Sequence, residues 1–190
     1  MVLLVEPCVR AGVLTAPECA ELTRALESAP ELAPARLAGG VDSDIRVCRA
    51  LWLDDVAETD WLFRRLAELV AEVNRTIYGF RLEDFREGVQ ILRYDEPVRG
   101  HAAGQYDAHI DIGSTGLTMS RKLSVSIQLT PPDAYDGGEL AIDVDGKWWI
   151  APRDQGTAIL FPSFVRHRVA PVRRGHRHAA VAWIHGPAFS

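Results

Sequence analysis

This sequence has few cysteines and no long hydrophobic segment, and both absences exclude classes of protein. Its three cysteines, Cys8, Cys19 and Cys48, are too few and odd in number for a disulfide framework, so we expect buried, reduced thiols in a cytoplasmic protein. The apolar run at residues 1–5 is far shorter than a signal peptide or a membrane span. We therefore expect neither secretion nor membrane insertion.

A strong charge imbalance is also missing. The formal net charge is −5, which argues against general nucleic-acid binding, and the sequence contains no internal repeat or low-complexity tract. Its 190 residues, 47% hydrophobic and 25% charged, are typical of a soluble globular protein. A chain of this length buries roughly 70% of its unfolded surface in one domain. We expect a single domain that covers residues 1–190.

Two helices are expected in the first 84 residues. Thr15 and Glu18 fit a capping box with Pro17 in the first turn, and an apolar stripe (Cys19, Leu22 and Leu26) follows at helical spacing. A second helix is predicted with Asp60 as its cap and Gly79 as its end. Its apolar stripe consists of Leu62, Leu66, Leu69, Val70, Val73 and Ile77. Both helices are predicted to support the fold rather than to carry chemistry.

The remaining chain is predicted to form short strands separated by turns, after a loop at residues 33–44. Strands are expected at residues 46–53, 89–94, 106–112, 123–129, 140–144, 157–161 and 177–184. The Asp-Gly-Gly sequence at residues 136–138 predicts a hairpin turn. Many short strands with Gly and Pro turns favour a sandwich or jelly roll. We expect a mainly β fold with flanking helices, with a helical part at residues 1–84 and a jelly-roll core at residues 85–190.

One predicted strand carries a candidate metal site. Side chains at positions i and i+2 of a strand share a face, so His109 and Asp111 point into one space while Ile110 points outward. A third ligand is expected from a strand late in the barrel, and His167, which follows a Pro-Ser bend, is the best candidate. Two histidines and one carboxylate bind ferrous iron and leave three coordination positions open.

The last predicted strand carries a candidate anion site. Its alternation places Arg177, Ala179, Val181 and Trp183 on one face. A guanidinium followed by small residues leaves open volume, and arginine binds carboxylates through two parallel hydrogen bonds. The final strand therefore predicts a pocket for an acidic ligand beside the metal site.

The ordered set of His109, Asp111, His167 and Arg177 resembles the iron- and 2-oxoglutarate-dependent oxygenases. Within them it resembles the prolyl-4-hydroxylase-like branch that includes the PKHD-type hydroxylases. Further segments similar to that branch lie at residues 92–95, 121–124, 136–140 and 177–184. The resemblance covers residues 85–185 and implies a double-stranded β-helix core with N-terminal supporting helices.

The resemblance also implies roles for single residues. His109, Asp111 and His167 would bind Fe(II), and Arg177 would hold the distal carboxylate of 2-oxoglutarate. Tyr94 matches a tyrosine that hydrogen-bonds the cosubstrate in this family. A core aromatic with a satisfied hydroxyl is an equally good interpretation of Tyr94.

Three further positions belong to the expected pocket. Gln128 stands near a position where some relatives place a second cosubstrate-binding side chain. Trp183 matches a tryptophan that walls the site in prolyl hydroxylases, and Tyr106 is expected beside the substrate or as a core aromatic. No catalytic residue is expected beyond the metal ligands.

The implied reaction is hydroxylation of an unactivated C–H bond with O2, coupled to conversion of 2-oxoglutarate into succinate and CO2. The expected substrate is a prolyl or other amino-acid residue, or an amino-acid-like small molecule, and ascorbate is a candidate further cofactor. Halogenases of this superfamily lack the metal carboxylate, so Asp111 favours hydroxylation. Nucleic-acid demethylases typically carry a second arginine where this chain has Trp183, so no nucleic acid is expected as partner. No membrane is expected as partner either, because the sequence has no long apolar segment.

Two other functions fit the same residues. One is a jelly-roll sensor or binding protein that holds the metal without turnover, and the other is a cupin-like zinc hydrolase that does not need Arg177. Substrate specificity is expected in the loops at residues 97–105, 113–120 and 33–44. The sequence determines neither the substrate nor the oligomeric state.

Several conspicuous side chains are expected to have no role in the site. His101, His176 and His178 are expected in loops or facing outward, and His185 is a weak candidate for the rim of the barrel. The pair at residues 148–149 (Trp-Trp) is expected to pack on an edge strand. The arginines at positions 166, 168, 173 and 174 are expected on a solvated surface.

Overall fold

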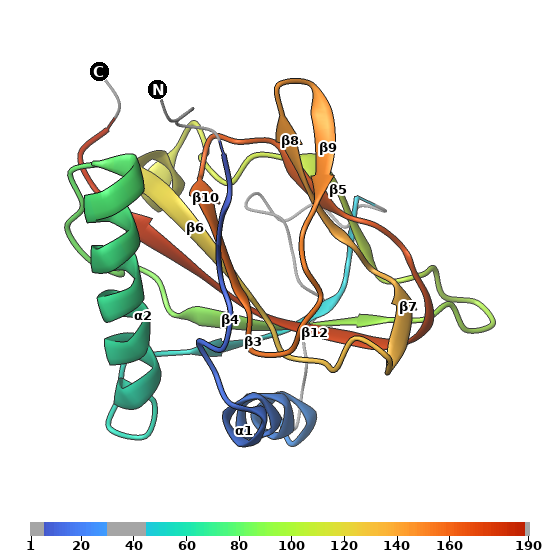
Figure 1. Cartoon of the computed structure of the whole chain (residues 1–190). Coiled ribbons are helices and arrows are strands. Elements are labelled where there is room, and N and C mark those ends of the chain that lie inside the picture. Colours follow the sequence, from blue (N-terminus) through green and yellow to red (C-terminus); the bar gives the residue numbers. More distant parts are fainter. Residues whose placement is uncertain (1–5, 30–44, 189–190) are drawn as a thin grey trace.

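Two antiparallel sheets face each other, and helices pack against the outside of the larger one (Figure 1). The computed structural model describes residues 6–29 and 45–188. The expected fold, a mainly β jelly roll with flanking helices, is confirmed. Among the described residues, every helix is too short or too polar to span a membrane. The predicted loop at residues 33–44 lies outside the described part of the chain.

Within the described part of the chain, the larger sheet has seven strands and the smaller one five. Neighbours in the larger sheet follow the order β1 (Cys8–Arg10), β10 (Ala158–Pro162), β6 (Arg121–Gln128), β12 (Val172–His185), β4 (Val89–Asp95) and β3 (Arg49–Leu53), with β7 (Tyr135–Gly137) paired to the start of β12. The smaller sheet follows the order β2 (Arg46–Val47), β5 (Gln105–His109), β11 (His167–Val169), β8 (Leu140–Val144) and β9 (Lys147–Ile150).

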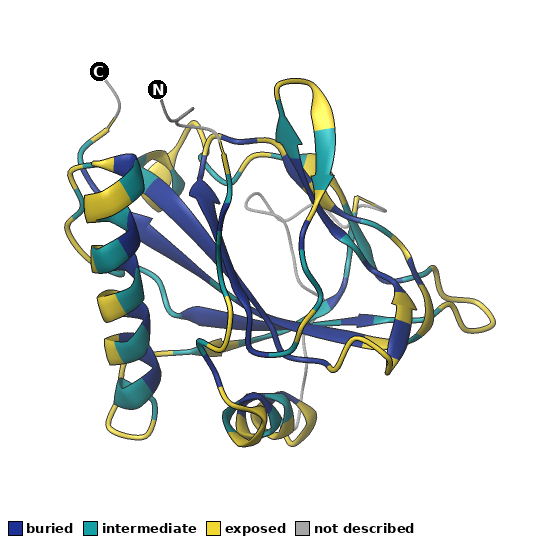
Figure 2. Cartoon of the chain, viewed as in Figure 1, coloured by how far each residue is buried: buried dark blue, intermediate teal, exposed yellow. Residues whose placement is uncertain are grey.

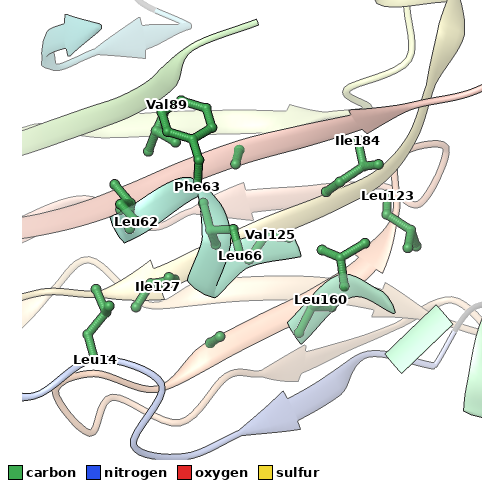
Figure 3. Packing of buried hydrophobic residues seen from close by; sticks show 14 of the residues in the cluster. Leu14, Leu62, Phe63, Leu66, Val89, Leu123, Val125, Ile127, Leu160 and Ile184 are labelled. Carbon is green, nitrogen blue, oxygen red and sulfur yellow. The ribbon is translucent and has the colours of Figure 1, made fainter. Parts of the chain in front are cut away.

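The period-two alternation of the central strands separates a core from a cavity. In β6, Leu123, Val125 and Ile127 join the hydrophobic cluster beneath the helices (Figure 3). The side chains of Ser124, Ser126 and Gln128 alternate with these three and lie on the opposite face, toward the smaller sheet. Strand β6 is therefore buried on both faces (Figure 2), with apolar side chains on one face and polar side chains on the other.

Helix α2 (Asp60–Val73) covers the apolar face of the larger sheet. Its buried residues are Leu62, Phe63, Leu66, Val70 and Val73. All of them except Phe63 belong to the apolar stripe that the sequence predicts. Burial of each such side chain stabilises the fold by about 1.5–3 kcal/mol. The opposite face of the helix is exposed, as its charged residues predict (Figure 2).

Two of the predicted helix ends are right and one is wrong. The capping box of α1 (Ala16–Glu27) is present, with the Thr15 backbone N–H donating to Glu18 at 2.7 Å. Gly79, with φ of 66°, ends the second helix after a π-helical turn at Asn74–Tyr78. Asp60 is not the cap of α2, because Thr59 precedes it at that position and Asp60 lies in the first turn.

The hairpin predicted at residues 136–138 is wrong. Strand β7 pairs with β12, whereas β8 pairs with β11 and β9, so the Asp-Gly-Gly segment carries the chain from one sheet to the other. A tight hairpin forms instead at Asp145 and Gly146, whose φ angles of 52° and 78° join β8 to β9. Turn residues indicate that the chain bends, but they do not indicate which strands pair.

Three strands differ clearly from the prediction, one of them at the metal site. Strand β5 ends at His109 instead of continuing to residue 112, and the run at residues 46–53 breaks into two strands at Cys48. The last strand begins at Val172, before the predicted start at residue 177. Strands β1 and β11 have only three residues each, which is too short for an alternating pattern.

Candidate active site

A cavity of about 480 Å³ lies between the two sheets. Arg177, Ala179, Val181 and Trp183 of β12 all line it, as the alternation of that strand predicts. Arg177 and Trp183 lie roughly 20 Å apart along the strand, and the two smaller side chains leave space between them. A ligand of small or moderate size therefore fits along the inner face of β12.

Three potential metal ligands meet at one side of this cavity. His109 ends β5 and His167 begins β11, and these two residues are directly paired in the smaller sheet. Asp111 lies two residues beyond the end of β5. Its two carboxylate oxygens are 3.6 Å from His109 Nε2 and 3.5 Å from His167 Nε2. The three donor atoms lie within 4.8 Å of one another.

Both imidazoles are oriented by backbone carbonyls. His109 Nδ1 lies 2.7 Å from the carbonyl oxygen of Asp107, and His167 Nδ1 lies 3.0 Å from that of Val165. Because a carbonyl can only accept, each Nδ1 donates and each Nε2 keeps its lone pair. Burial lowers the pKa of His167, although the Asp111 carboxylate opposes that shift, and so favours the neutral, metal-binding form.

The Asp111 carboxylate is held from the larger sheet. Ser124 Oγ donates to Asp111 Oδ2 at 2.6 Å, and the Asp111 backbone N–H donates to the Ser163 carbonyl at 2.9 Å. Burial opposes its ionisation, but the adjacent His167 and His109 and the Ser124 hydroxyl outweigh burial and hold the pKa of this carboxyl well below its usual range. The side chain is therefore an anion with one fixed orientation.

These donors fit a first-row divalent metal. Two imidazole nitrogens and one carboxylate on one side of an ion are the ligands of non-haem Fe(II) oxygenases, and adjacent ligands of such an ion lie ~3 Å apart. The observed separations of about 3.5 Å are close to that spacing. The sequence prediction did not include the supporting Ser124 and Ser163, although the polar face of β6 marks the first of them.

Arg177 lies on the cavity face of β12 and is only 1% exposed. Its Nη2 donates to Gln128 Oε1 at 3.0 Å, and its guanidinium lies 5.4 Å from the centre of the Tyr94 ring. Its Nε is buried without a hydrogen-bond partner among the described residues. A buried guanidinium with an unsatisfied donor and no paired carboxylate favours an acidic ligand.

Gln128 and Tyr94 take different positions around that guanidinium. Tyr94 lines the cavity, and burial raises the pKa of its phenol, which stays protonated and able to donate. Gln128 does not line the cavity among the described residues. It accepts from Arg177 and donates through Nε2 to the Pro152 carbonyl at 3.0 Å. Direct contact of Gln128 with a cosubstrate stays a prediction.

Trp183 and Arg121 close the other end of the cavity. The Arg121 guanidinium lies 3.8 Å from the Trp183 ring centre, makes two 2.6 Å hydrogen bonds to Glu87, and donates to the Asp111 carbonyl at 3.1 Å. Trp52 lies beside Trp183, with 6.0 Å between ring centres. No role is predicted from the sequence for Arg121 or Glu87. The two residues lie 34 positions apart, and no local sequence pattern predicts that they pair.

Tyr106 packs directly against the metal side of the cavity. Its ring stacks on that of His109 with 3.4 Å between centres, and burial raises its pKa to about 12. The ring thus restricts the rotation of one candidate ligand. Its position is compatible with both sequence interpretations, since Tyr106 is half-buried and also lines the cavity.

The remaining histidines lie away from the metal ligands, and one prediction about them is wrong. His101 and His176 are exposed, as expected. His178 is buried rather than outward-facing, because Glu27 of α1 lies 2.9 Å from its Nε2. His185 is fully buried beside Glu87, at 3.1 Å, and does not line the cavity among the described residues. The partner of His178 is 151 residues away in sequence, which local patterns cannot predict.

The fold and the cavity together define a jelly-roll protein with a two-histidine, one-carboxylate metal site and a buried arginine in the same cavity. Sequence relatives identify the family. A PKHD-type hydroxylase of Thioalkalivibrio sulfidiphilus is 30% identical over 171 residues, which cover 87% of this chain and 71% of the relative. The chain belongs to the PKHD-type hydroxylase family. No family profile matches it.

Other relatives match over a shorter stretch. A PKHD-type hydroxylase of Colwellia psychrerythraea is 37% identical over 83 residues, and one of Hyphomonas neptunium is 38% identical over 82 residues. These matches cover 43% and 42% of this chain, respectively, and 37% of each relative. The chain thus spans little more than a third of these relatives' length in the matched region.

Solved structures share the fold. A Pseudomonas putida prolyl-4-hydroxylase superposes with a TM-score of 0.74 at 23% identity, covering 97% of this chain and 94% of that one. A prolyl hydroxylase of Trichoplax adhaerens, in complex with a hypoxia inducible factor peptide fragment, superposes with a TM-score of 0.77 at 18% identity, covering 94% and 83%. At these identities the likeness concerns the fold alone.

Proposed function

We propose that this protein is an Fe(II)- and 2-oxoglutarate-dependent hydroxylase that acts on an amino-acid residue or an amino-acid-like molecule. One observation carries the proposal. The His109, Asp111 and His167 donors share a cavity with Arg177, which is buried and pairs with no carboxylate among the described residues. A metal site alone fits many proteins. The guanidinium in the same cavity adds a place for the distal carboxylate of a chelating dicarboxylic acid.

The roles of the side chains follow from their orientation. His109 and His167 would bind iron through Nε2, because each Nδ1 is engaged by a carbonyl. Asp111 would supply the carboxylate that Ser124 fixes. Arg177 would bind the cosubstrate, and the protonated Tyr94 hydroxyl would donate to it.

The bound iron and cosubstrate would supply the oxidative chemistry, in which O2 is activated while 2-oxoglutarate is converted into succinate and CO2. The chain itself excludes water and positions the substrate. Trp183 and Tyr106 wall the cavity, and Trp183 Nε1 is a buried donor without a partner among the described residues. That donor is available to a carbonyl or hydroxyl of the substrate.

We propose that residues 1–190 act as one domain in a reducing compartment such as the cytoplasm. The helices pack on the sheet whose other face holds the site, so the two parts share one structural element. Cys8, Cys19 and Cys48 are all free and buried, which agrees with reducing conditions.

An anaerobic titration tests the proposed function. Fe(II) followed by 2-oxoglutarate should produce a weak visible absorption band with wild-type protein, because the cosubstrate chelates the metal. Replacing His109 or His167 with alanine should abolish the band. Arg177→Gln should retain iron but require a much higher 2-oxoglutarate concentration, since the pocket loses its cation.

Turnover then separates the alternatives. Release of succinate on admission of O2, with or without ascorbate, supports a hydroxylase. A stable iron complex with no succinate under any tested substrate would instead identify a sensor. Retention of zinc, together with indifference to Arg177→Gln, would contradict the proposal and favour a zinc hydrolase.

A further inference from the structure

The cavity lining includes a guanidinium, that of Arg46, to which the proposed reaction gives no role. Arg46 of β2 pairs with Tyr106 of β5, and its guanidinium lies 5.0 Å from the centre of the Tyr106 ring. Its Nη2 donates to Gln90 Oε1 at 2.8 Å, and all three residues line the cavity. Within residues 6–29 and 45–188, Arg46 forms no salt bridge and its buried Nε has no hydrogen-bond partner.

The charges of the described residues that line the cavity do not balance without a further anion. Among residues 6–29 and 45–188, Arg46, Arg121 and Arg177 contribute three positive charges to the lining, and Asp111 and Glu87 two negative ones. Fe(II) and the 2-oxoglutarate dianion cancel each other. One positive charge therefore remains when the proposed metal and cosubstrate are both bound. Because a partly buried charge without a counter-ion is unfavourable, the complete active complex favours one more anion.

The remaining charge belongs to Arg46. The Arg121 guanidinium is neutralised by Glu87 through two hydrogen bonds of 2.6 Å. Arg177 is proposed to hold one carboxylate of 2-oxoglutarate, and the metal takes the other, so the cosubstrate has no third carboxylate to offer. Arg46 also comes from the smaller sheet, on the Tyr106 side of the site, whereas Arg177 comes from the larger one.

We infer that Arg46 and Gln90 form a binding subsite for a carboxylate of the primary substrate. Arginine binds a carboxylate through two parallel hydrogen bonds, and Arg46 keeps Nε free for one of them. Gln90 uses Oε1 to accept from Arg46, which leaves its Nε2 hydrogens for the same anion. The inference rests on the proposed function and narrows its substrate to a carboxylic acid.

The position of the subsite relates the carboxylate to the reacting carbon. Arg46 packs over Tyr106, and the Tyr106 ring stacks on His109, so the guanidinium is one aromatic ring away from a metal ligand. A molecule held there by its carboxylate would lie on the metal side of the cavity. The exposed Trp52 and Ile110 side chains, both in the cavity lining, add apolar contact for an aliphatic or ring portion. An amino acid has both features.

Spectroscopic titration tests the subsite without requiring turnover. The anaerobic complex of protein, Fe(II) and 2-oxoglutarate is titrated with free amino acids, including proline and leucine, and with their carboxamides. A second set consists of short peptides with a free or an amidated C-terminus and peptides with an internal Asp or Glu. The readout is the change in the visible band when a compound enters the site.

Wild-type protein should respond to carboxylates and bind the matched amides roughly 30-fold or more weakly, as expected for loss of a buried charge pair. Arg46→Gln should remove that preference, and Arg46→Lys should retain part of it. Neither variant should change the 2-oxoglutarate affinity by more than about threefold. Arg49→Gln is the matched control, because Arg49 pairs with Asp95 and does not line the described cavity.

The outcomes separate this inference from the proposed function. If wild-type protein gives no iron–2-oxoglutarate band, the proposed function fails. If the band forms but acids and amides act equally, or no carboxylate in either set changes it, only the carboxylate subsite is refuted. Weaker 2-oxoglutarate binding by Arg46→Gln would assign Arg46 to the cosubstrate and also refute it. Comparing the responses to free amino acids and to peptides identifies which kind of molecule supplies the carboxylate. If Arg46→Gln misfolds, the comparison of wild type with Arg46→Lys still tests the subsite.

Discussion

The carboxamide of Gln128 lies between Arg177 and the Pro152 backbone. Its Oε1 accepts from Arg177 Nη2 at 3.0 Å, and its Nε2 donates to the Pro152 carbonyl at 3.0 Å. Gln128 and Arg177 are each only 1% exposed. Because the carbonyl fixes which end of the amide faces the arginine, Gln128 holds the guanidinium in one orientation.

This arrangement predicts graded effects on cosubstrate binding. Gln128→Ala should weaken 2-oxoglutarate binding roughly tenfold, because Arg177 loses an orienting hydrogen bond. Gln128→Glu should weaken it further, since the new carboxylate would pair with the guanidinium and repel the cosubstrate. Anaerobic titration of the iron-loaded variants measures both dissociation constants. Equal affinity in wild type and Gln128→Glu would contradict this arrangement.

Metal affinity should depend on the histidines at the cavity and not on those outside it. His167→Ala should weaken Fe(II) binding by more than the roughly 10–100-fold that loss of a residue supporting a ligand costs, because a ligand itself is removed. Ser124→Ala should fall within that range, since it only orients Asp111. Isothermal titration under anaerobic conditions provides the measurement.

The control for this series is His176→Ala. His176 is exposed and lies 2.8 Å from Asp95, outside the described cavity lining. Its removal should leave the iron affinity unchanged. A comparable loss in His176→Ala and His167→Ala would show that the loss is not specific to the assigned ligand and would contradict the prediction.

Stability should depend on pH through Glu87. Burial opposes its ionisation, but His185 and Arg121 outweigh burial and lower the pKa of Glu87 to about 2 from the ordinary value of 4.5. A folded-state pKa below the unfolded value stabilises the protein above pH ~4.5, and that stabilisation is lost as the pH falls toward 2. Glu87→Gln should therefore lower the free energy of unfolding by on the order of 3 kcal/mol near neutral pH.

Denaturant unfolding at several pH values measures this difference. The gap between wild type and Glu87→Gln should narrow by about 1.4 kcal/mol per pH unit below pH ~4.5. Glu68→Gln, on the exposed face of α2, should show no gap at any pH. A gap that does not change with pH would mean that Glu87 acts through shape rather than charge.

The helix-side core should affect stability without affecting the metal site. Leu66 is 1% exposed, within the cluster between α2 and the larger sheet (Figure 3). Leu66→Ala should destabilise the fold by about 2–5 kcal/mol and lower Tm by roughly 5–15 °C, because it leaves a cavity. Glu68→Ala should change stability by no more than about 0.5 kcal/mol.

Iron binding below the melting temperature distinguishes a local from a general effect. Leu66→Ala should keep wild-type iron affinity, since the cluster packs on the sheet face opposite the cavity. Calorimetry gives the melting temperature, and the anaerobic titration gives the affinity. Reduced affinity in the fully folded variant would show that the helix supports the site directly.

The sequence by itself determined which residues face inward along the long strands. Because side chains alternate along a strand with a period of two, the sequence of residues 177–183 alone predicts which of their side chains share the cavity face. The β6 pattern separates its core face from its polar face for the same reason. The capping box at Thr15 and the stop at Gly79 are equally local, because each depends on residues within one helical turn.

Only the tertiary structure decided which residues meet. Asp111 does not share a strand with His109, since β5 ends and the Ser163 carbonyl fixes the turn that follows. The Asp-Gly-Gly segment crosses between sheets, and His178 finds Glu27 on a distant helix. Arg46 enters the cavity because a two-residue strand pairs with β5. Such contacts depend on strand pairing and register, which local periodicity does not specify.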